Sequence, residues 1–323
     1  MTIKLAFIGT GGIAQHHMNT IAQIEGVTIS AFCDIDMIRA EQAASKWNGA
    51  KAFSNIDEML DTAKPDGVYI CVPPMAHGDA ERKVIGRGLP FFVEKPLGID
   101  SSIPSELLHE VRSKGIITGA GYHWRYQDST KKAQEILQSC KPGMALGYWM
   151  GGMPMVPWWR LQQGSGGQFV EQTTHIVDLL RYLCGDVKEV YAAYALRVMH
   201  EKVDGTEVPD VGTVTLKLAN GMVATISNTC LIPIEHRIGL DIYSDRGVLE
   251  IRGDMLRDLS TKEAAEFKGA SNATRSEDEA FIHAIRTGDT SRILCDYAEA
   301  YKTHEVTIAA NKSAQTGKTI ILT

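Results

Sequence analysis

A glycine-rich turn after an apolar run near the start of the chain constrains the fold more than any other feature. Residues 5–8 form the run, and Gly9 then permits a tight turn out of a strand. Gly11 has no Cβ, so a phosphate can approach the backbone, and Ala14 lets the following helix pack closely. A second apolar run, residues 27–33, leads directly into Asp34. Strand, glycines, helix and carboxylate in this order predict a dinucleotide-binding unit.

The turn and the carboxylate define the predicted cofactor contacts. Asp34 would accept hydrogen bonds from a ribose diol, and its charge would repel a 2′-phosphate, which favours NAD over NADP. No basic residue follows Asp34 directly, although Arg39 further along keeps NADP as the less expected alternative. The predicted contacts in this region are Gly9, Thr10, Gly11, Gly12, Ile13 and Asp34.

Composition places the chain among ordinary globular proteins. It has 323 residues, 44% of them hydrophobic and 22% charged, which suits two domains with ample core. The net charge of -6 leaves no basic surplus for a phosphate backbone, so we expect no nucleic-acid partner. Six scattered cysteines without a C-x-x-C pair indicate a reducing compartment. Because no secretory signal pattern and no bilayer-length apolar stretch is found, we expect a cytoplasmic protein without a membrane partner.

The pattern of apolar residues changes along the chain. Over residues 1–121, short apolar runs alternate with amphipathic stretches, which predicts a Rossmann domain: an α/β, doubly wound parallel sheet covered by helices. Residues 122–323 carry long alternating runs, with hairpin signals at 220–221 and 245–247. They predict an α+β domain with a large, open, mainly antiparallel sheet that binds the substrate.

Few helices are predicted in the second domain. One strong pattern covers residues 171–183, and two further helices, near 277–286 and 297–312, close the chain. A C-terminal helix could pack back on the first domain. Residues 202–209 and 262–272 are expected to be exposed loops.

Polar residues follow two predicted strands of the first domain, where ligands bind in such sheets. Pro73 and His77, after the run 67–72, are predicted cofactor contacts, although His77 could instead cap the next helix. Glu94 and Lys95 follow the run 90–93. Lys95 is predicted to hold a substrate oxygen, where a lysine can stabilise developing negative charge. Glu94 either contacts the cofactor or only holds the turn.

Two further groups of residues are candidate substrate contacts. His123 and Arg125 lie at the predicted domain junction, where they could reach the substrate or simply tie the domains together. Trp159 and Arg160 lie in a long loop rich in Gly and Pro. An exposed tryptophan could stack on a sugar face, and an arginine could bind a hydroxyl or carboxylate. A dimer contact or an apolar latch is an equally open interpretation of this loop.

Glu171, His175 and Asp178 share one face of the helix predicted at 171–183. At about 100° per residue they fall within an arc of roughly 60°. A histidine flanked by two carboxylates is suited to acid–base chemistry, so His175 is predicted as the general base and Glu171 as the group that orients it. Asp178 would bind a neighbouring substrate hydroxyl. The trio could also ligate a metal, but no further ligand cluster accompanies it, and no metal is predicted.

Four stretches in order resemble a known family. They are residues 71–77, the Glu-Lys-Pro motif at 94–96, residues 121–126, and residues 166–178. With the glycine turn and Asp34, they are similar to the glucose–fructose oxidoreductase / inositol dehydrogenase / MocA (Gfo/Idh/MocA) family over nearly the whole chain. The resemblance implies that Lys95 lies beside the nicotinamide and that His175 is the acid–base residue. Sugar and polyol dehydrogenases of the family typically have an aspartate where this chain has Glu171, which leaves the substrate open.

The resemblance also implies an activity and an assembly. The expected reaction is NAD-dependent oxidation of a secondary hydroxyl on a sugar, polyol or sugar derivative. A redox-neutral, NAD-dependent glycosidase of the same family and a non-catalytic NAD-binding sensor are the alternatives. Relatives form homodimers or homotetramers through the C-terminal sheet, and the alternating strands here would leave apolar residues on its outer face.

Overall fold

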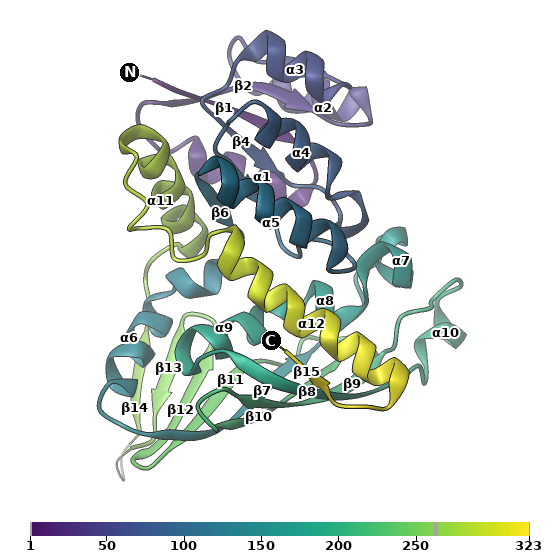
Figure 1. Cartoon of the computed structure of the whole chain (residues 1–323), viewed down its shortest axis with the longest axis vertical. Helices are drawn as coiled ribbons and strands as arrows, with labels where there is room; N and C mark the ends of the chain where they lie inside the picture. The colour runs from purple at the N-terminus through teal and green to yellow at the C-terminus, as the bar shows by residue number, and fades with distance from the viewer. Residues whose placement is uncertain (1, 261–263, 323) are drawn as a thin grey trace. The chain divides into compact units, whose positions relative to one another are not determined.

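The chain folds into two compact units. The computed structural model describes residues 2–260 and 264–322 (Figure 1). Unit 1 contains the residues up to Gly98 together with Ser102–His123 and Asn272–Tyr301. Unit 2 contains Ile99–Ser101, Trp124–Ser271 and the residues from Lys302 onward.

Unit 1 is built on a six-stranded sheet with the order β3-β2-β1-β4-β5-β6, in which every neighbouring pair is parallel. Its strands are β1 (Ile3–Ile8), β2 (Val27–Cys33), β3 (Lys51–Phe53), β4 (Gly67–Ile70), β5 (Phe91–Val93) and β6 (Thr118–Ala120). The strand order reverses between β1 and β4. Ligands of doubly wound sheets bind at such a switch point, beyond the carboxyl ends of the strands.

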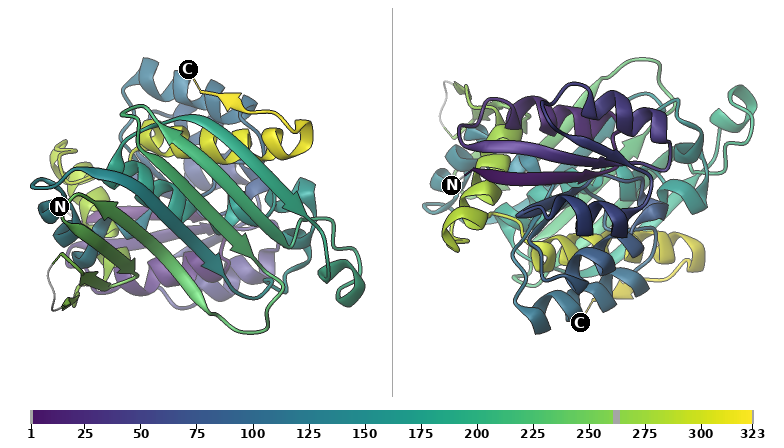
Figure 2. Two further views of the ribbon diagram at one scale, coloured as in Figure 1. Left: turned by 90° about the horizontal axis from the view of Figure 1, so that it is seen from below. Right: turned by 90° about the horizontal axis from the view of Figure 1, so that it is seen from above.

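Helices pack on both faces of this sheet, as Figure 2 (right) shows. They are α1 (Gly12–Ile21), α2 (Met37–Ala44), α3 (Ile56–Ala63), α4 (Asp79–Gly86), α5 (Ser102–Lys114) and α11 (Ala273–Thr287), with the short 3₁₀ turn η1 (Pro74–Ala76). A second 3₁₀ turn, η2 (His123–Tyr126), begins at the last residue of a unit 1 segment and continues in unit 2. One core lies between the sheet and α1, α2 and α11, and it includes Phe7 and Phe32. The other lies under α3, α4 and α5 and includes Ile8 and Val68. Because both faces are covered, the strands are apolar almost throughout.

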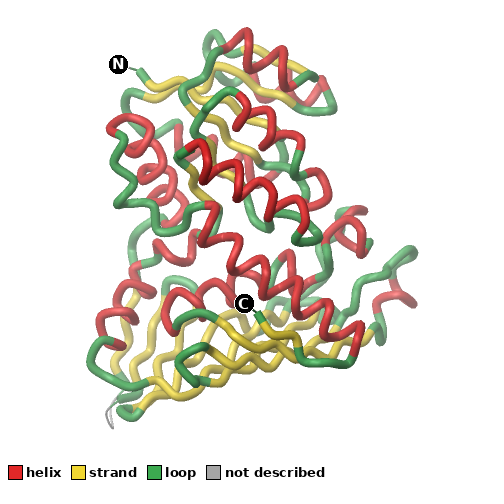
Figure 3. The backbone as a smooth tube through the Cα atoms, in the orientation of Figure 1, coloured by secondary structure: helices red, strands yellow, loops and turns green. Residues whose placement is uncertain are grey.

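Unit 2 contains a nine-stranded sheet with the order β14-β13-β12-β11-β7-β10-β9-β8-β15. Figure 3 draws the strands of both sheets in yellow. Its strands are β7 (Pro142–Met150), β8 (Val187–Ala195), β9 (Val211–Leu218), β10 (Val223–Thr229), β11 (Arg237–Ser244), β12 (Gly247–Arg252), β13 (Met255–Asp258), β14 (Ala265–Lys268) and β15 (Ile320–Ile321). Only β7 and β10 pair in parallel, and all the other pairs are antiparallel.

One face of the large sheet packs against helices. The helical segments of this unit are α6 (Asp128–Leu137), η3 (Pro157–Arg160), α7 (Gln162–Ser165), α8 (Gln168–Glu171), α9 (Thr174–Cys184), α10 (Met199–Lys202) and most of α12 (Tyr297–Thr316). Ile176 and Leu180 of α9 share a core with Val214 and Ile226 of the strands. The opposite face, toward the viewer in Figure 2 (left), carries exposed side chains at alternate positions such as Thr215.

The predicted fold class is confirmed in both sheets, with four short strands that the sequence pattern did not predict. These are β3, β13, β14 and β15, which are too short for a periodic pattern to stand out. Strand β14 lies inside the expected loop 262–272, so the loop prediction was wrong for residues 265–268. Residues 262 and 263 of that loop lie outside the described residues. Among the described residues, no helix combines the length and the apolar character needed to cross a membrane.

Candidate functional site

The glycine turn after β1 is held by backbone constraint and by Asp34. Gly9 has φ 88°, and a Cβ at this position would lie 2.3 Å from the carbonyl oxygen of Cys71. The backbone N–H and the hydroxyl of Thr10 both donate to Asp34 Oδ2, at 2.9 Å and 2.8 Å. Asp34 therefore ties the turn to the end of β2, and it stays half-buried at the sheet edge.

The N-terminus of α1 fits a bound pyrophosphate. No side chain of the described residues caps this helix at Gly11, so its first N–H groups are available to an anion. A Cβ added at Gly11 or Gly12 would meet no atom within 4 Å, which leaves open space above the turn. Ile35, next to Asp34, is 101% exposed, and Ile38 is 64% exposed. This apolar surface beside a carboxylate suits an adenosine group.

Substitutions at the two glycines should separate folding from cofactor binding. Gly9→Ala is expected to destabilise unit 1 by about 1–3 kcal/mol, because alanine is strained at this φ and its Cβ would meet backbone. Gly11→Ala should leave the unfolding midpoint unchanged, because its φ is −67° and the added methyl meets nothing. The same methyl would lie where a phosphate approaches, so NAD affinity should fall. Urea unfolding and NAD titration of both variants test this, and equal effects at the two positions would contradict it.

The segment after β4 places His77 against a carboxylate. His77 Nδ1 lies 2.6 Å from Glu81 Oε1, and the other oxygen of Glu81 accepts the backbone N–H of Gly78 at 2.6 Å. Burial alone would raise the pKa of Glu81, but the neighbouring His77 and these hydrogen bonds lower it. Glu81, and not His77, thus accepts the backbone N–H at the start of α4, and His77 contacts the carboxylate that does so. Pro73 comes directly before η1, at the same sheet edge.

Glu94 and Lys95 follow β5, two strands from the glycine turn in the sheet order. Glu94 is 4% exposed: its Oε1 lies 3.0 Å from His17 Nε2, and its Oε2 accepts the backbone N–H of Lys95 at 3.0 Å. A Cβ at Gly121 would lie 2.3 Å from the Glu94 carboxylate, so this glycine makes room for it. Glu94 thus holds the turn, one of its two predicted roles. Lys95 is half-buried and precedes a cis proline, Pro96.

His123 lies at the C-terminal end of a unit 1 segment, half-buried by accessible surface. Burial lowers its pKa to about 4, against the opposing charge of Glu94. The imidazole is therefore neutral near pH 7 and can accept or donate one hydrogen bond.

In unit 2, the predicted helix 171–183 is interrupted. Glu171 ends the short helix α8, and α9 begins at Thr174. The prediction that Glu171, His175 and Asp178 share one helix face was therefore wrong. Two consecutive threonines, which are poor helix formers, lie at the break. His175 is 5% exposed and stacks on Trp149, with ring centroids 5.9 Å apart.

Arg125 and Asp178, both predicted substrate contacts, form a buried ion pair with each other. Arg125 Nε donates to Asp178 Oδ2 at 2.8 Å, and Arg125 Nη2 donates to Oδ1 at 2.7 Å. The hydroxyl of Thr303 also donates to Oδ1, at 2.8 Å. The Asp178 side chain has 0% exposure and that of Arg125 2%. Both oxygens are occupied within the core of unit 2, so the structure corrects their predicted role to a structural one.

The prediction that Trp159 stacks on a sugar face was also wrong. It is 1% exposed, in a small core with Met153 and Val208, so its ring faces cannot stack on a sugar. Its indole N–H donates to Glu171 Oε2 at 2.7 Å, which fixes the Glu171 carboxylate. Arg160 remains at the surface of the loop, where Nη1 donates to the carbonyl of Asp204 at 2.9 Å.

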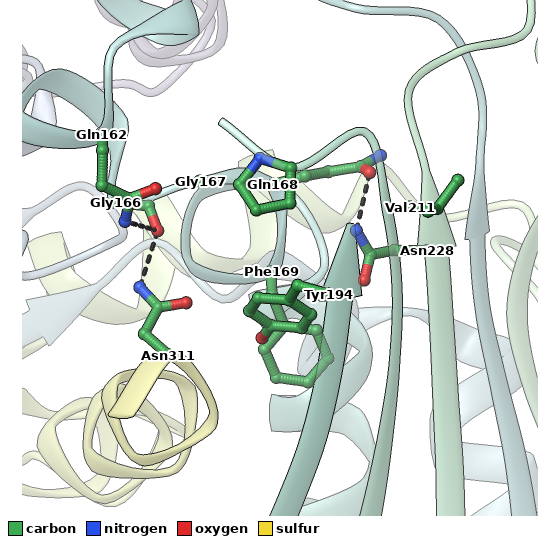
Figure 4. Close-up of a pocket in the computed structure, with 10 residues that line it drawn as sticks. Gln162, Gly166, Gly167, Gln168, Phe169, Tyr194, Val211, Asn228 and Asn311 are labelled. Carbon is green, nitrogen blue, oxygen red and sulfur yellow. Dashed lines mark hydrogen bonds between the residues drawn. The ribbon is translucent and has the colours of Figure 1, made fainter. Parts of the chain in front are cut away.

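A pocket opens beside the glycine pair that precedes α8 (Figure 4). Asn228 Nδ2 donates to Gln168 Oε1 at 2.7 Å, and Asn311 Nδ2 donates to the carbonyl of Gly166 at 2.7 Å. The hydroxyl of Tyr194 and Oδ1 of Asn228 are buried without a partner among the described residues, which suits a water molecule or a ligand hydroxyl. The hollow, ≈ 230 Å³ with its open mouth included, is smaller than pockets that enclose whole ligands.

Two family models match this chain. One, described as an oxidoreductase family with an NAD-binding Rossmann fold, covers residues 3–122. The other, the GFO/IDH/MocA C-terminal domain, covers residues 143–250. The chain belongs to the Gfo/Idh/MocA family of oxidoreductases.

Individual Gfo/Idh/MocA proteins are similar over the full length. An uncharacterized oxidoreductase of Bacillus subtilis, YrbE, is 26% identical, with 98% of this chain and 92% of the relative covered. The scyllo-inositol 2-dehydrogenase (NAD(+)) of the same organism is 24% identical, with 99% and 96% covered. The crystal structure of the WlbA dehydrogenase from Bordetella pertussis, in complex with NADH and UDP-GlcNAcA, has a TM-score of 0.86 at 22% identity, covering 100% of this chain and 99% of that one. That likeness concerns the fold.

The Gfo/Idh/MocA fold of this chain also brings together residues that the sequence did not point to. His17 on α1 and Asp278 on α11 are buried in unit 1 and connect to Glu94 through hydrogen bonds. The available signal was a histidine on the apolar side of α1, between Ala14 and Met18. Asp278 gave no signal, because its partners are distant in the sequence.

Proposed function

We propose that this chain is an NAD-dependent dehydrogenase that oxidises a secondary hydroxyl of a sugar, a polyol or a sugar derivative. The observation that carries the proposal is the arrangement at one edge of the unit 1 sheet. The glycine turn after β1 leaves the N-terminus of α1 open to an anion, and Lys95 follows β5 at the same carboxyl edge. Relatives named as inositol dehydrogenases support the substrate class.

We propose that Lys95 holds the reacting oxygen and stabilises the negative charge that develops on it. His175 takes the hydroxyl proton as general base, and Glu171, fixed by the Trp159 indole, orients His175. When bound, NAD supplies the hydride acceptor.

The remaining predicted substrate contacts divide into two groups. His123 and Arg160 stay proposed contacts to substrate hydroxyls. Arg125 and Asp178 are no longer proposed contacts, because their buried ion pair satisfies both side chains. Trp159 is not a proposed contact either, because its side chain is buried.

We propose NAD as the preferred cofactor. Asp34 carries its negative charge at the end of β2, where it would repel a 2′-phosphate. Arg39, the basic residue that could accept such a phosphate, lies 3.5 Å from Asp36, another carboxylate. A higher affinity for NAD than for NADP is therefore the expected result of titrating both cofactors.

The test of the function is NADH absorbance with purified protein, NAD and a panel of aldoses, polyols, inositols and uronates, with NADP run in parallel. Formation of NADH with one stereochemical group of substrates would support the proposal. Release of a leaving group from glycosides without net NADH would instead identify a redox-neutral glycosidase. Tight NAD binding without turnover of any compound would identify a sensor.

We further propose that the uncovered face of the unit 2 sheet binds a second copy of this chain. Met144, Tyr191 and Val223 expose 39%, 47% and 46% of their surface, and the strand register places Met144 and Val223 opposite each other. Apolar side chains on an open sheet face favour self-association.

Light scattering of the native protein should therefore report a dimer or tetramer. Val223→Glu should shift it toward monomer, because the substitution puts a charge on this face. Ile234→Glu is the matched control: Ile234 is 66% exposed but lies outside the strands. A monomeric native protein would contradict the proposal.

A further inference from the structure

A buried series of hydrogen bonds in unit 1 leads from α11 to the segment that carries Lys95. Asp278 Oδ1 lies 2.7 Å from His17 Nδ1, and His17 Nε2 lies 3.0 Å from Glu94 Oε1. The other oxygen of Glu94 accepts the backbone N–H of Lys95. His17 and Asp278 have no exposed surface, at 0% each, and Glu94 has 4%. Three separate elements, α11, α1 and the end of β5, thus meet through one imidazole.

The far end of this series is anchored. Asp278 also accepts hydrogen bonds from the hydroxyls of Tyr69, at 3.0 Å, and Thr20. The imidazole of His17 packs between aromatic rings, with centroids 5.4 Å from Tyr69 and 5.1 Å from Phe92. Water is therefore excluded, and the carboxylates depend on these donors.

Both ring nitrogens of His17 face carboxylate oxygens. A proton on each nitrogen therefore gives both nitrogens an acceptor and both carboxylates a donor. Burial alone would lower the pKa of His17, but the charges and hydrogen bonds of Asp278 and Glu94 raise it well above 6.5. Donor atoms of His17, Glu94 and Glu277 lie within 4.8 Å of one another, a spacing that could also hold a metal ion. The imidazolium already supplies a cation between the carboxylates, at hydrogen-bonding distances.

We propose that His17 and Asp278 are positioning residues for Lys95: the imidazolium, fixed by Asp278, holds the Glu94 carboxylate, and Glu94 holds the Lys95 backbone. The inference rests on the proposed function of Lys95. Without the imidazolium, Glu94 and Asp278 would face each other as buried charges of the same sign, and Glu94 would turn away. The Lys95 segment would then shift, and a displacement of about 1 Å at a reacting group can cost about 10² in rate.

Other titratable groups surround this imidazolium. Glu277 of α11 is 2% exposed; burial raises its pKa well above the ordinary value, and His17 opposes that shift. Burial likewise raises the pKa of Tyr69 on β4 and that of Cys71 after it. Tyr69 and Cys71 are therefore neutral near pH 7, as is His123. The charges that set the state of His17 are those of Glu94 and Asp278.

The direct test is hydrogen exchange of the Lys95 backbone amide, which needs no turnover. In His17→Gln, this amide should exchange at least about tenfold faster than in the native protein. Thr118→Val is the matched control, because it removes another buried hydrogen bond of unit 1, which the backbone N–H of Tyr297 donates to the Thr118 hydroxyl. It should leave Lys95 exchange and kcat unchanged. Unchanged Lys95 exchange in folded His17→Gln would overturn the proposal, even if the chain proves to be no dehydrogenase.

Asp278→Asn supplies a second test, which does not require removal of the histidine. The pKa of His17 is raised in the folded protein. The stabilisation that such a group provides is complete below its ordinary pKa and is lost as the pH rises through its pKa in the folded state. Without the Asp278 charge, the folded pKa of His17 falls, so the loss begins at lower pH. The alkaline limb of kcat should move down by at least about one pH unit, with kcat recovered near pH 6 and KM little changed. A uniform fall of kcat at all pH values would contradict the positioning role.

Discussion

Replacement of Lys95 with alanine is expected to lower kcat by about 10²–10³-fold, because the reacting oxygen loses the charged donor that stabilises it. NAD affinity should change by less than about threefold, under 1 kcal/mol, because the glycine turn and the N-terminus of α1 are unchanged. Steady-state kinetics on the substrate that the panel identifies, together with an NAD titration, give both numbers. Glu94 still accepts the backbone N–H of residue 95 in this variant, so the fall in kcat measures the contribution of the ammonium group.

Two variants check this interpretation. Lys95→Met keeps most of the apolar stem without the charge, so it should lose as much activity as Lys95→Ala. Lys132→Ala removes an exposed lysine of α6 and should leave turnover unchanged. Normal turnover in Lys95→Ala would end the dehydrogenase proposal in its present form.

The sequence predicted unit 1 closely because local signals there coincide with tertiary structure. Gly9 must adopt a positive φ, a parallel strand covered on both faces must be apolar, and Asp34 ends such a strand. Each is a constraint on single residues or short runs. The positions of the glycine turn, of His77 and of Lys95 at the carboxyl edge of the sheet follow from that pattern.

The candidate site in unit 2 was harder to predict, because its side chains are set by contacts between distant segments. Helical periodicity placed Glu171 and His175 on one helix face, but the helix is interrupted between α8 and α9. A tryptophan in a Gly- and Pro-rich loop suggested exposure, yet Trp159 packs inward against Val208. Periodicity reports which residues share a face only while the element continues.

His17 shows the same limit inside unit 1. A histidine on an amphipathic helix is as compatible with a surface position as with a buried one. Its burial follows from the approach of α11, which begins about 250 residues later in the chain and brings Asp278 to its Nδ1. Buried polar networks between distant segments leave little trace in a single sequence.

The buried pair Arg125–Asp178 leads to the second large expected effect. Asp178→Ala should destabilise unit 2 by about 3–5 kcal/mol, because the guanidinium of Arg125 would remain buried without a carboxylate. The guanidinium also lies 4.9 Å from the ring of Tyr182, which cannot replace a charge. Urea unfolding followed by tryptophan fluorescence is suited to the measurement, since four of the five tryptophans, at 124, 149, 158 and 159, belong to unit 2.

An exposed ion pair in the same unit serves as a control for the effect of burial on the free energy of unfolding. Lys132 Nζ lies 3.1 Å from Glu135 Oε2 on α6, and the two side chains are 46% and 52% exposed. Glu135→Ala should therefore cost less than about 1 kcal/mol, since water can solvate the remaining Lys132 ammonium. If Asp178 instead bound the substrate, Asp178→Asn would raise KM while leaving the unfolding curve in place. The structural role requires the opposite: a lower unfolding midpoint, with KM unchanged in the fraction that stays folded.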